Sequence, residues 1–487
     1  TVNGIPFDST NTTSEILTSS GIIPLTNTST FFETYKSYSL DGSQLPKFIL
    51  SSGISNQQIN LNLLNPRSGN VNVKTNKGSF NLTFDNQNVD LQYINTNWVQ
   101  KGTKSPWFVN ASQARLVGTE FLGTPNQGWS CNLSADGNTL AIGGPSDNTS
   151  DGATWIFTRS GNTWSQQDKL IGSSGISAFQ GISCSLSADG NTLAVGGNAA
   201  GSNYGAAWIF IRSGNPPIWT EQAKLVGSSG ISSQQGISCS LSADGNTLAV
   251  GGYGDNSNYG ATWIFTRSNS VWTQQGNKLV GSSGSTSRQG TSCSLSADGN
   301  TLSVGGPTVG GNTGATWIFT RSGNPSGWTE QSKLIGSNGT NSRQGTSCSL
   351  SSDGNTLAVG GYTADSNYGA TWIFTRSGNT WSQQTKLIGS NGTGSRQGYS
   401  CSLSSDGNTL AVGGFASNSN YGATWIFTRT GNPAVWTQQN KLIGSNGTGS
   451  SQGYSCSLSA DGNTLAVGGI DADTEFGSNF GATWVFI

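Results

Sequence analysis

The stretch SCSLSADGNTLAVGG (residues 183–197) recurs with small changes along most of the 487-residue chain. Each copy contains one cysteine, and the cysteines follow one another at intervals of 53–55 residues. Self-similarity at a fixed period is the signature of a repeat architecture. The stretch therefore marks seven copies of one structural unit. Their cysteines are Cys131, Cys184, Cys239, Cys293, Cys348, Cys401 and Cys456.

Each unit contains the residues of four short strands. In the second copy Ile182, Cys184 and Leu186 alternate with serines, which predicts a strand with one buried face. Asp189-Gly190 then supplies the positive φ values of a tight hairpin, and the chain returns as TLAVGG. ATWIFTR has the β-branched and aromatic content of a third strand, and TWSQQDKLIGS forms the fourth after a turn at RSGN. We expect one four-stranded antiparallel blade per unit.

The two ends of the repeat region predict how the blades close. Blades of this kind pack radially into propellers of about four to eight blades. The last copy ends at GATWVFI (residues 481–487) without a fourth strand, whereas WFVNASQARLVG (residues 107–118) resembles a fourth strand with no blade before it. We expect this early strand to complete the seventh blade and protect its edge. The predicted fold class is all-β, with a seven-bladed β-propeller over residues 107–487.

The unit resembles the FG-GAP repeat of the β-propeller in integrin α chains. Gln-Gly or Gly-Tyr stands at the place of Phe-Gly, and VGG, or GGP at residues 143–145 and 305–307, at the place of Gly-Ala-Pro. The tandem units also resemble those of propeller proteins from large DNA viruses and bacteria. The resemblance implies a fold and not one function, because such propellers host many functions. Several FG-GAP members bind calcium after the first strand, but SADGN here offers a single carboxylate.

Composition excludes several classes of function. A formal net charge of −1 and 10% charged residues give no basic excess for binding nucleic acid. No stretch is long and apolar enough to predict a membrane span. The sequence begins at Thr1 without a basic and apolar leader, so we expect any targeting segment to be absent from this form. The absence of histidine removes the commonest general base, which predicts that the chain is not an enzyme and needs no cofactor. The alternative is an enzyme whose catalytic site is a pair of carboxylates brought together across the ring.

The repeated side chains each have a structural interpretation. We expect the seven cysteines to be buried, unpaired thiols, since equivalent residues of separate blades rarely meet disulfide geometry; a ring of thiolate metal ligands is the alternative, without the paired spacing of zinc sites. Asp189 is expected to face Arg212 or Arg159 in a surface pair. One tryptophan per third strand predicts packing between blades, with sugar platforms as the alternative. These tryptophans are Trp155, Trp208, Trp263, Trp317, Trp372, Trp425 and Trp484.

Two sets of loops are candidates for recognition. The loops after the second strand vary between units, and we expect them to share one face with the GSSGIS linkers between blades. In the last unit this loop is IDADTEFGSNFG (residues 470–481). Asp471, Asp473 and Glu475 at alternate positions offer oxygen ligands to a cation, although the glycine and glutamate spacing of a calcium loop is missing. A solvated acidic loop is the other interpretation.

The first 106 residues do not repeat. Residues 1–52 are polar and predict an extended N-terminal arm. Residues 53–106 predict a small β-rich stalk, with three alternating runs over residues 71–93 that have no evident partner within the chain. Residues 88–100 resemble the β-rich stalk ends of viral fibre and tail-fibre proteins. We expect self-association through five stalk residues: Phe80, Leu82, Phe84, Val89 and Leu91.

These features favour a non-enzymatic structural protein of a virion surface or extracellular fibre, assembled through its N-terminal region and displaying a propeller. The alternative is an adhesin or lectin-like module that recognises a host protein or glycan through the propeller's loop face. An enzyme built on the propeller is the third hypothesis, and no site in the sequence supports it.

Overall fold

The computed structural model describes residues 113–487, except residues 285, 324–326, 391, 393, 432–433, 446–448, 473, 475–476 and 478. Within residues 1–112 it describes strands β1 to β9 by their backbone alone. The chain divides into two compact units, Thr1–Ser105 and Pro106–Ile487.

Residues 113–487 form a seven-bladed β-propeller, in which each blade is a four-stranded antiparallel sheet. We number the blades 1 to 7 in the order of their innermost strands. The innermost strands are β11 (Ser130–Leu133), β15 (Ser183–Leu186), β19 (Ser238–Leu241), β23 (Ser292–Leu295), β27 (Ser347–Leu350), β31 (Ser400–Leu403) and β35 (Gln452–Leu458). The second strands are β12 (Thr139–Gly144), β16 (Thr192–Gly197), β20 (Thr247–Gly252), β24 (Thr301–Gly306), β28 (Thr356–Gly361), β32 (Thr409–Gly414) and β36 (Leu465–Gly469).

The outer half of each blade comes from the third and fourth strands of the repeat. The third strands are β13 (Ala153–Ser160), β17 (Ala206–Ser213), β21 (Ala261–Ser268), β25 (Ala315–Ser322), β29 (Ala370–Ser377), β33 (Ala423–Thr430) and β37 (Ala482–Phe486). The outermost strands are β14 (Thr163–Leu170), β18 (Ile218–Leu225), β22 (Val271–Gln274), β26 (Gly327–Leu334), β30 (Thr380–Leu387), β34 (Val435–Leu442) and β10 (Gln113–Leu116). Four-residue helices lie between second and third strands: α1 (Asp147–Ser150), α2 (Ala200–Asn203), α3 (Asp255–Asn258), α4 (Val309–Asn312), α5 (Ala364–Asn367) and α6 (Ser417–Asn420).

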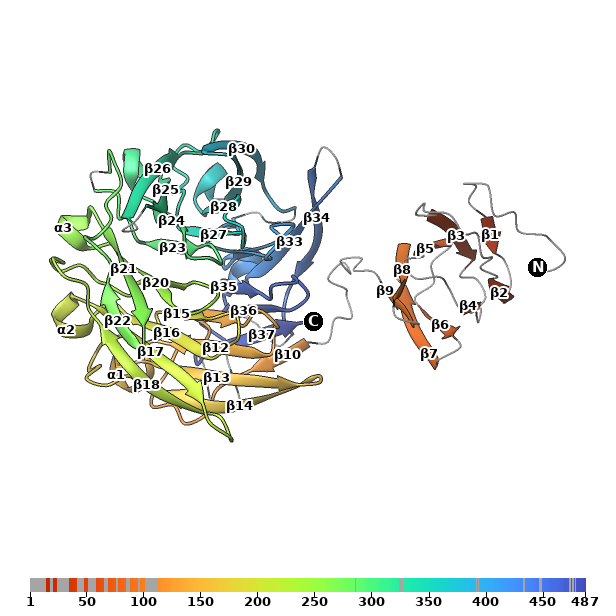
Figure 1. Cartoon of the computed structure of the whole chain (residues 1–487), viewed down its shortest axis with the longest axis horizontal. Coiled ribbons are helices and arrows are strands. Elements are labelled where there is room, and N and C mark those ends of the chain that lie inside the picture. Colours follow the sequence, from red (N-terminus) through yellow and green to blue (C-terminus); the bar gives the residue numbers. More distant parts are fainter. Residues whose placement is uncertain are drawn as a thin grey trace. The chain divides into compact units, whose positions relative to one another are not determined.

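Strand β10 closes the ring, as the sequence predicts. It pairs antiparallel with β37, with Leu116 opposite Thr483, so the seventh sheet runs β10-β37-β36-β35. In Figure 1 the colours run around the propeller until the blue strands of the C-terminal blade lie beside the orange β10. Residues 107–112 of the predicted closing strand lie outside the described residues. The edge of β37 is thus covered by a strand from the start of the domain.

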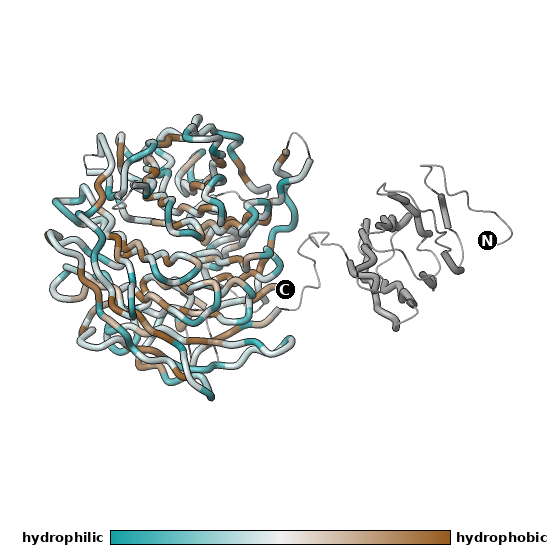
Figure 2. The backbone as a smooth tube through the Cα atoms, in the orientation of Figure 1, coloured by the Kyte–Doolittle hydropathy of each residue, from teal (hydrophilic) through white to brown (hydrophobic). Residues whose placement is uncertain are grey.

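The core lies between neighbouring blades, and its largest members are the third-strand tryptophans. All seven indoles are 0% exposed, which confirms their interpretation as core residues. One cluster joins Ala141 and Ile156 of blade 1 to Trp208 and Phe210 of blade 2. Figure 2 shows hydrophobic residues along many of the strands and hydrophilic residues at many of the turns. Each blade buries its two faces against two neighbours. Removing one blade would therefore expose an apolar face of each neighbour to water.

A closed circle of backbone hydrogen bonds also joins the seven hairpins between first and second strands. The N–H of Ala135 donates to the carbonyl of Ala188, and the series continues blade by blade until Ala460 donates to Ala135, with lengths of 2.9–3.0 Å. The hairpin turns form as predicted, with Gly190 at φ +67°. Each turn therefore fixes its own blade and the next one.

The N-terminal unit contains two sheets. Their orders are β1-β3-β5-β8-β9 and β2-β4-β6-β7. The strands are β1 (Glu15–Leu17), β2 (Gly21–Ile23), β3 (Tyr35–Asp41), β4 (Phe48–Leu50), β5 (Gln58–Leu64), β6 (Gly69–Thr75), β7 (Gly78–Phe84), β8 (Asn88–Ile94) and β9 (Asn97–Gln100).

This pairing places strands of the predicted arm and of the predicted stalk in the same sheets. The expectation that the strands of residues 71–93 lack partners within the chain is wrong, because β7 pairs with β6, and β8 pairs with both β5 and β9. Periodicity alone indicates each strand but cannot indicate a partner that lies far away in sequence. The five stalk residues lie in β7 and β8, and their side chains fall outside the described part of the chain.

Candidate functional site on the loop face

The two faces of the propeller differ in what they present. The hairpin face carries the Asp-Gly turns, which repeat almost unchanged. The loop face carries the loops after the second strands together with the linkers between blades. The structure joins these two sets, since Ser177 of a linker donates its N–H to Asp151 of a variable loop at 2.7 Å. They therefore share one face, as expected from the sequence.

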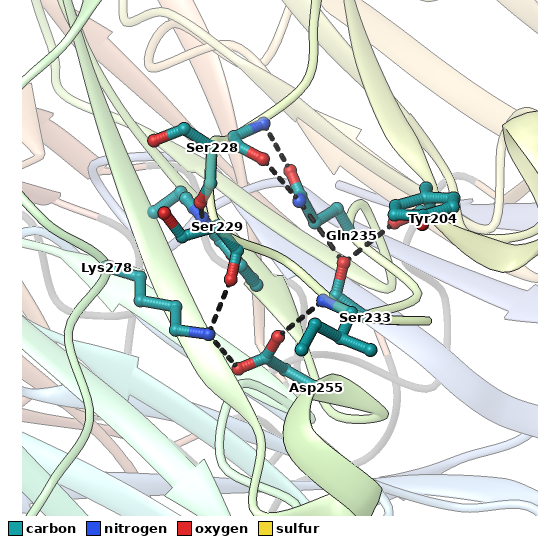
Figure 3. A network of polar contacts seen from close by, with 10 residues as sticks. Tyr204, Ser228, Ser229, Ser233, Gln235, Asp255 and Lys278 are labelled. Atoms are coloured by element: carbon teal, nitrogen blue, oxygen red, sulfur yellow. Dashed lines mark hydrogen bonds and ion pairs between the residues drawn. The ribbon is translucent and has the colours of Figure 1, made fainter.

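Side-chain hydrogen bonds hold the loop face in place, as Figure 3 shows for one linker. The fully buried amide of Gln235 accepts from the N–H of Gly227 at 2.6 Å and donates to its carbonyl at 3.0 Å. Asp255, from the variable loop, accepts from the N–H of Ile231 and pairs with Lys278 at 2.6 Å. The linkers and loops are thus built as a rigid platform.

The buried tryptophans are part of this platform. The indole of Trp263 donates to the carbonyl of Ser228 at 2.8 Å, and Lys278 lies over its ring at 5.9 Å. Gly227 packs so closely against the same indole that an added Cβ would come within 2.1 Å of it. No face of these rings is open to a ligand, so the alternative of tryptophan sugar platforms is wrong.

One sector of the loop face departs from the repeat. Two residues before the cysteine of each repeat, blades 2 to 5 carry isoleucine or threonine, such as Ile182 and Thr291, whereas blades 6, 7 and 1 carry Tyr399, Tyr454 and Trp129. Further aromatic and cationic residues surround them, and all are partly exposed. We name the arginine–aromatic sector by its seven members: Trp129, Arg343, Tyr362, Arg396, Tyr399, Phe415 and Tyr454.

The aromatic rings of the sector form a continuous cluster across four blades. The ring centroids of Tyr399 lie 4.7 Å from those of both Tyr454 and Phe415. Trp129 extends the cluster from Tyr454 at 4.9 Å, and Tyr362 extends it from Tyr399 at 5.5 Å. The pairs are tilted or edge-to-face, and each ring stays partly exposed.

Two guanidinium groups border this cluster. The Arg343 group lies 5.6 Å from the Tyr362 ring centroid and donates to the Tyr362 hydroxyl, and Arg396 lies 5.2 Å from the Phe415 centroid. Within the part of the chain that the structure describes, the ion pairs involve lysines and none involves these arginines. Arg288 occupies the same repeat position one blade earlier, where it lies over Tyr253 outside the sector.

Two tyrosine hydroxyls of the sector, those of Tyr399 and Tyr454, have raised pKa values. Burial raises the pKa of Tyr399, and a hydrogen bond with Tyr454 together with the nearby Arg396 partly offsets this rise. Burial also raises the pKa of Tyr454, and the neighbouring Tyr399 and Asp471 add to the rise. Both hydroxyls therefore act as hydrogen-bonding groups rather than as phenolates.

The acidic loop of blade 7 lies beside the sector. Asp471 accepts a hydrogen bond from the Ser451 hydroxyl at 2.7 Å. Asp473 and Glu475 lie outside the described residues, so a cation site formed by these three carboxylates stays a prediction. Among the described residues, no group of three or more acidic, histidine or cysteine side chains is placed to hold a metal ion.

The cysteines line the inner parts of the blade interfaces as free thiols. Cys131 and Cys184 are buried and the other five are partly buried. The Cys184 thiol lies 3.7 Å from the carbonyl oxygen of Ala141 in the preceding blade. Burial raises the pKa of Cys184 to about 12. The thiols thus behave as small packing groups and not as nucleophiles.

The predicted pair of Asp189 and Arg212 is indirect. Asp189 accepts from Ser187 and from the side chain and backbone of Asn191, and Asn191 in turn accepts from the Arg212 Nε at 2.9 Å. Arg212 also donates to Thr139 of the preceding blade at 3.2 Å. This array ties neighbouring blades together on the hairpin face.

Sequence reasoning missed the arginine–aromatic sector. The signal was present in the repeat itself: SRQG replaces AFQG and SQQG in three units, and QGYS replaces QGIS in two. Each substitution changes a single residue of the repeat, and the substitutions become a site only when the ring brings the units together.

No protein-family model matches the chain, and no curated protein matches it. Solved structures with a similar fold include a "putative 6-phosphogluconolactonase" from Bacteroides uniformis, at 12% identity and a TM-score of 0.48, covering 74% of this chain and 93% of that chain. A protein from Lactobacillus plantarum has 13% identity, the same coverage and a TM-score of 0.48. These likenesses concern the fold alone. The FG-GAP and viral resemblances remain hypotheses.

Among the described residues, no helix is long and apolar enough to cross a membrane.

Proposed function

We propose that this chain is a non-enzymatic protein of a virion surface or extracellular fibre, in which residues 1–106 join copies and the propeller presents a recognition surface. The observation that carries the proposal is the arginine–aromatic sector, where the repeat gives way to aromatic and cationic side chains. Its partner is a host protein or glycan that contacts the loop face. The display role and the adhesin role are thus two parts of one function.

The composition of the sector supports recognition. Tyr, Trp and Arg are the residues that contribute most to binding energy at interfaces. Arg343 and Arg396 have φ values of +54° and +59°, a left-handed conformation that costs an L-residue about 1–2 kcal/mol and that glycine or asparagine adopts more easily. The equivalent Phe179 and Gln234 have φ values of +56° and +54°, so the backbone conformation does not select arginine at these positions.

The inside of the propeller supports binding rather than catalysis. A cavity of about 220 Å³ lies within the ring of innermost strands. Its described lining consists of serine, leucine, alanine and one asparagine, and none of these side chains titrates near neutral pH. The chain contains no histidine, and burial keeps the cysteines protonated. A hydrolytic or proton-transfer site has no evident acid or base in this cavity.

The proposed assembly role rests on the strand edges of the N-terminal unit. β7 is the last strand of its sheet, and β9 is the last strand of the other. An open edge invites a strand from another subunit, and propeller blades lose such edges when the ring closes. We therefore place self-association in residues 1–106.

The recognition role is tested by binding the full chain to arrays of glycans and surface proteins. We expect saturable binding by the wild type and its loss in Tyr399→Ala/Tyr454→Ala. The matched control is Asn162→Ser, an exposed residue in a turn of the hairpin face, and it should bind as the wild type does. Binding that survives the sector variant, or that N162S abolishes, would move the recognition surface elsewhere. Ordered self-assembly with no ligand on any array would leave the structural role alone.

A further inference from the structure

We propose that the arginine–aromatic sector binds a carboxylated sugar, with Arg343 and Arg396 receiving the carboxylate and the aromatic rings receiving the sugar. This inference rests on the proposed function, since it assigns a ligand class to the same surface. Three features of the sector lead to it: its uncompensated charge, its arrangement of rings, and the acceptor at its far end.

The charge of the sector favours an anion. Arg343 and Arg396 come from the linkers before blades 5 and 6, and neither pairs with a carboxylate among the described residues. Arg343 uses one donor on the Tyr362 hydroxyl, which leaves the rest of its five N–H groups for a ligand. Guanidinium groups and carboxylates match in geometry, because two parallel N–H donors meet two oxygens.

The contacts of the two arginines also hold them in place. The Arg343 guanidinium lies 5.6 Å from the Tyr362 centroid, and the Arg396 guanidinium lies 5.2 Å from the Phe415 centroid. Cation–π contacts of this kind fix a flexible side chain before a ligand arrives. A fixed side chain loses less entropy on binding, so each hydrogen bond to the anion contributes more affinity.

The rings indicate a sugar. The two pyranose faces present C–H groups that pack on aromatic rings, while the equatorial hydroxyls exchange hydrogen bonds at the edges. Tyr399, Phe415 and Tyr454 supply three ring surfaces within 6 Å of one another, and two of them end in neutral hydroxyls. These aromatic rings beside a guanidinium group match a sugar ring that carries several hydroxyls and one carboxylate.

The far end of the sector offers an acceptor for sugar donors. Asp471 follows β36 of blade 7, two blades beyond Arg343 and one beyond Arg396 in the ring. Its carboxylate accepts from Ser451 and retains lone pairs for hydroxyl or amide donors of a ligand. A ligand with its carboxylate toward blades 5 and 6 and its hydroxyls toward blade 7 therefore meets complementary groups at both ends.

Nucleic acid fits this surface poorly. A polyanionic strand needs a groove of many cations along its phosphates. The sector contains two guanidinium groups and no lysine, and the whole chain has a net charge of −1. A ligand with a single carboxylate matches the charge of these two guanidinium groups better than a polyanion does.

The test uses the full-length protein and saturation-transfer NMR followed by titration with four methyl glycosides. Two carry a carboxylate, those of N-acetylneuraminic acid and glucuronic acid, and two are neutral, those of N-acetylglucosamine and glucose. We expect at least one carboxylated glycoside to bind, and the stronger of the two distinguishes a sialic acid from a uronic acid. Its neutral counterparts should bind at least about tenfold more weakly, since a charge-assisted hydrogen bond would be missing.

Two variants locate the site. R343Q/R396Q should weaken binding of the carboxylated glycoside about 10- to 100-fold. The matched control is R288Q, at the same repeat position and with the same backbone conformation but outside the sector, and it should retain wild-type affinity. Thermal unfolding of each variant, compared with the wild type, separates loss of binding from loss of fold.

The outcomes distinguish this inference from the function on which it rests. Equal binding of neutral and carboxylated glycosides would overturn the carboxylate assignment while supporting recognition at the loop face. Binding that R343Q/R396Q leaves unchanged would overturn the proposed site. Failure of all four glycosides, with a surface protein bound on the arrays instead, would overturn the sugar assignment and leave recognition intact.

Discussion

Replacing Leu116 with alanine in the full chain should weaken the closure of the propeller selectively. Leu116 of β10 is 8% exposed and lies in a core cluster with Trp155 of blade 1 and Val485 of blade 7. Removing a buried leucine side chain beyond Cβ costs about 2–5 kcal/mol, and we expect about 2–3 kcal/mol here because the site lies at the edge of the core. Leu442 is the matched control, since it is also 8% exposed and also faces a threonine of its third strand.

The two variants should differ in where the structure opens. Leu442 lies on β34, which a short turn of the chain joins to its neighbour β33. β10 has no such link to β37 and is held to it only by non-covalent pairing. Hydrogen exchange measured by mass spectrometry should therefore accelerate in β37 and β10 of Leu116→Ala. The acceleration should be about 30- to 140-fold, because 1.4 kcal/mol corresponds to a factor of ten. The other blades should change much less.

The opposite pattern would refute the reasoning. If Leu116→Ala and Leu442→Ala accelerate exchange equally and in every blade, the ring opens as one cooperative unit and β10 is not its weakest contact. Unchanged exchange in β37 would mean that β10 contributes little to closure.

Four further predictions concern a buried glycine, the free thiols and the N-terminal unit. Gly227→Ala should lower the unfolding midpoint strongly in thermal scans, because its Cβ would clash with the indole of Trp263, whereas Gly161→Ala, with nothing within 4 Å, should lower it only through backbone strain at φ +60°. Thiol titration without reductant should count seven thiols in denaturant and few in the native protein. The contribution of the thiols to the free energy of unfolding should be fully present below about pH 9 and be lost as the pH rises from there toward 12, because burial raises the pKa of Cys184 from 9.0 to about 12 and the fold therefore favours the protonated thiol. Sedimentation should show residues 107–487 as a monomer and the full chain as an oligomer, and serine at the five stalk residues should reduce that oligomer; a propeller that oligomerises alone would place assembly in its blades.

The sequence predicts the propeller well because the signals of a blade are local. The alternation at Cys184, the turn at Asp189-Gly190 and the tryptophan of each third strand all lie within one unit. Closure is also predictable, because a missing fourth strand at one end matches an extra one at the other. Burial of the tryptophans follows from the radial packing of blades, because every blade of a closed ring has a neighbour on each face.

The candidate site is not predictable from the same signals. Tyr399 and Tyr454 lie one repeat apart in sequence, yet their ring centroids are 4.7 Å apart because their blades are neighbours. Each departs from the repeat at a single position, and Trp129 joins them only through closure between blades 7 and 1. In the N-terminal unit, parallel pairing of β1 with β3 and of β3 with β5 joins segments whose alternation shows a strand but no partner. Contacts that a three-dimensional ring or crossover creates leave little trace in a single sequence.

Oxidative footprinting of the full chain, with and without its bound glycan, tests the central claim most directly. Hydroxyl radicals modify exposed aromatic side chains, so the rate at each residue reports its accessibility. We expect ligand to protect Trp129, Tyr399 and Tyr454, while Tyr204 and Tyr259, which are 50% and 39% exposed on the same face, keep their rates. Protection confined to Tyr204 and Tyr259, or to the hairpin face, would contradict the assignment of recognition to the arginine–aromatic sector.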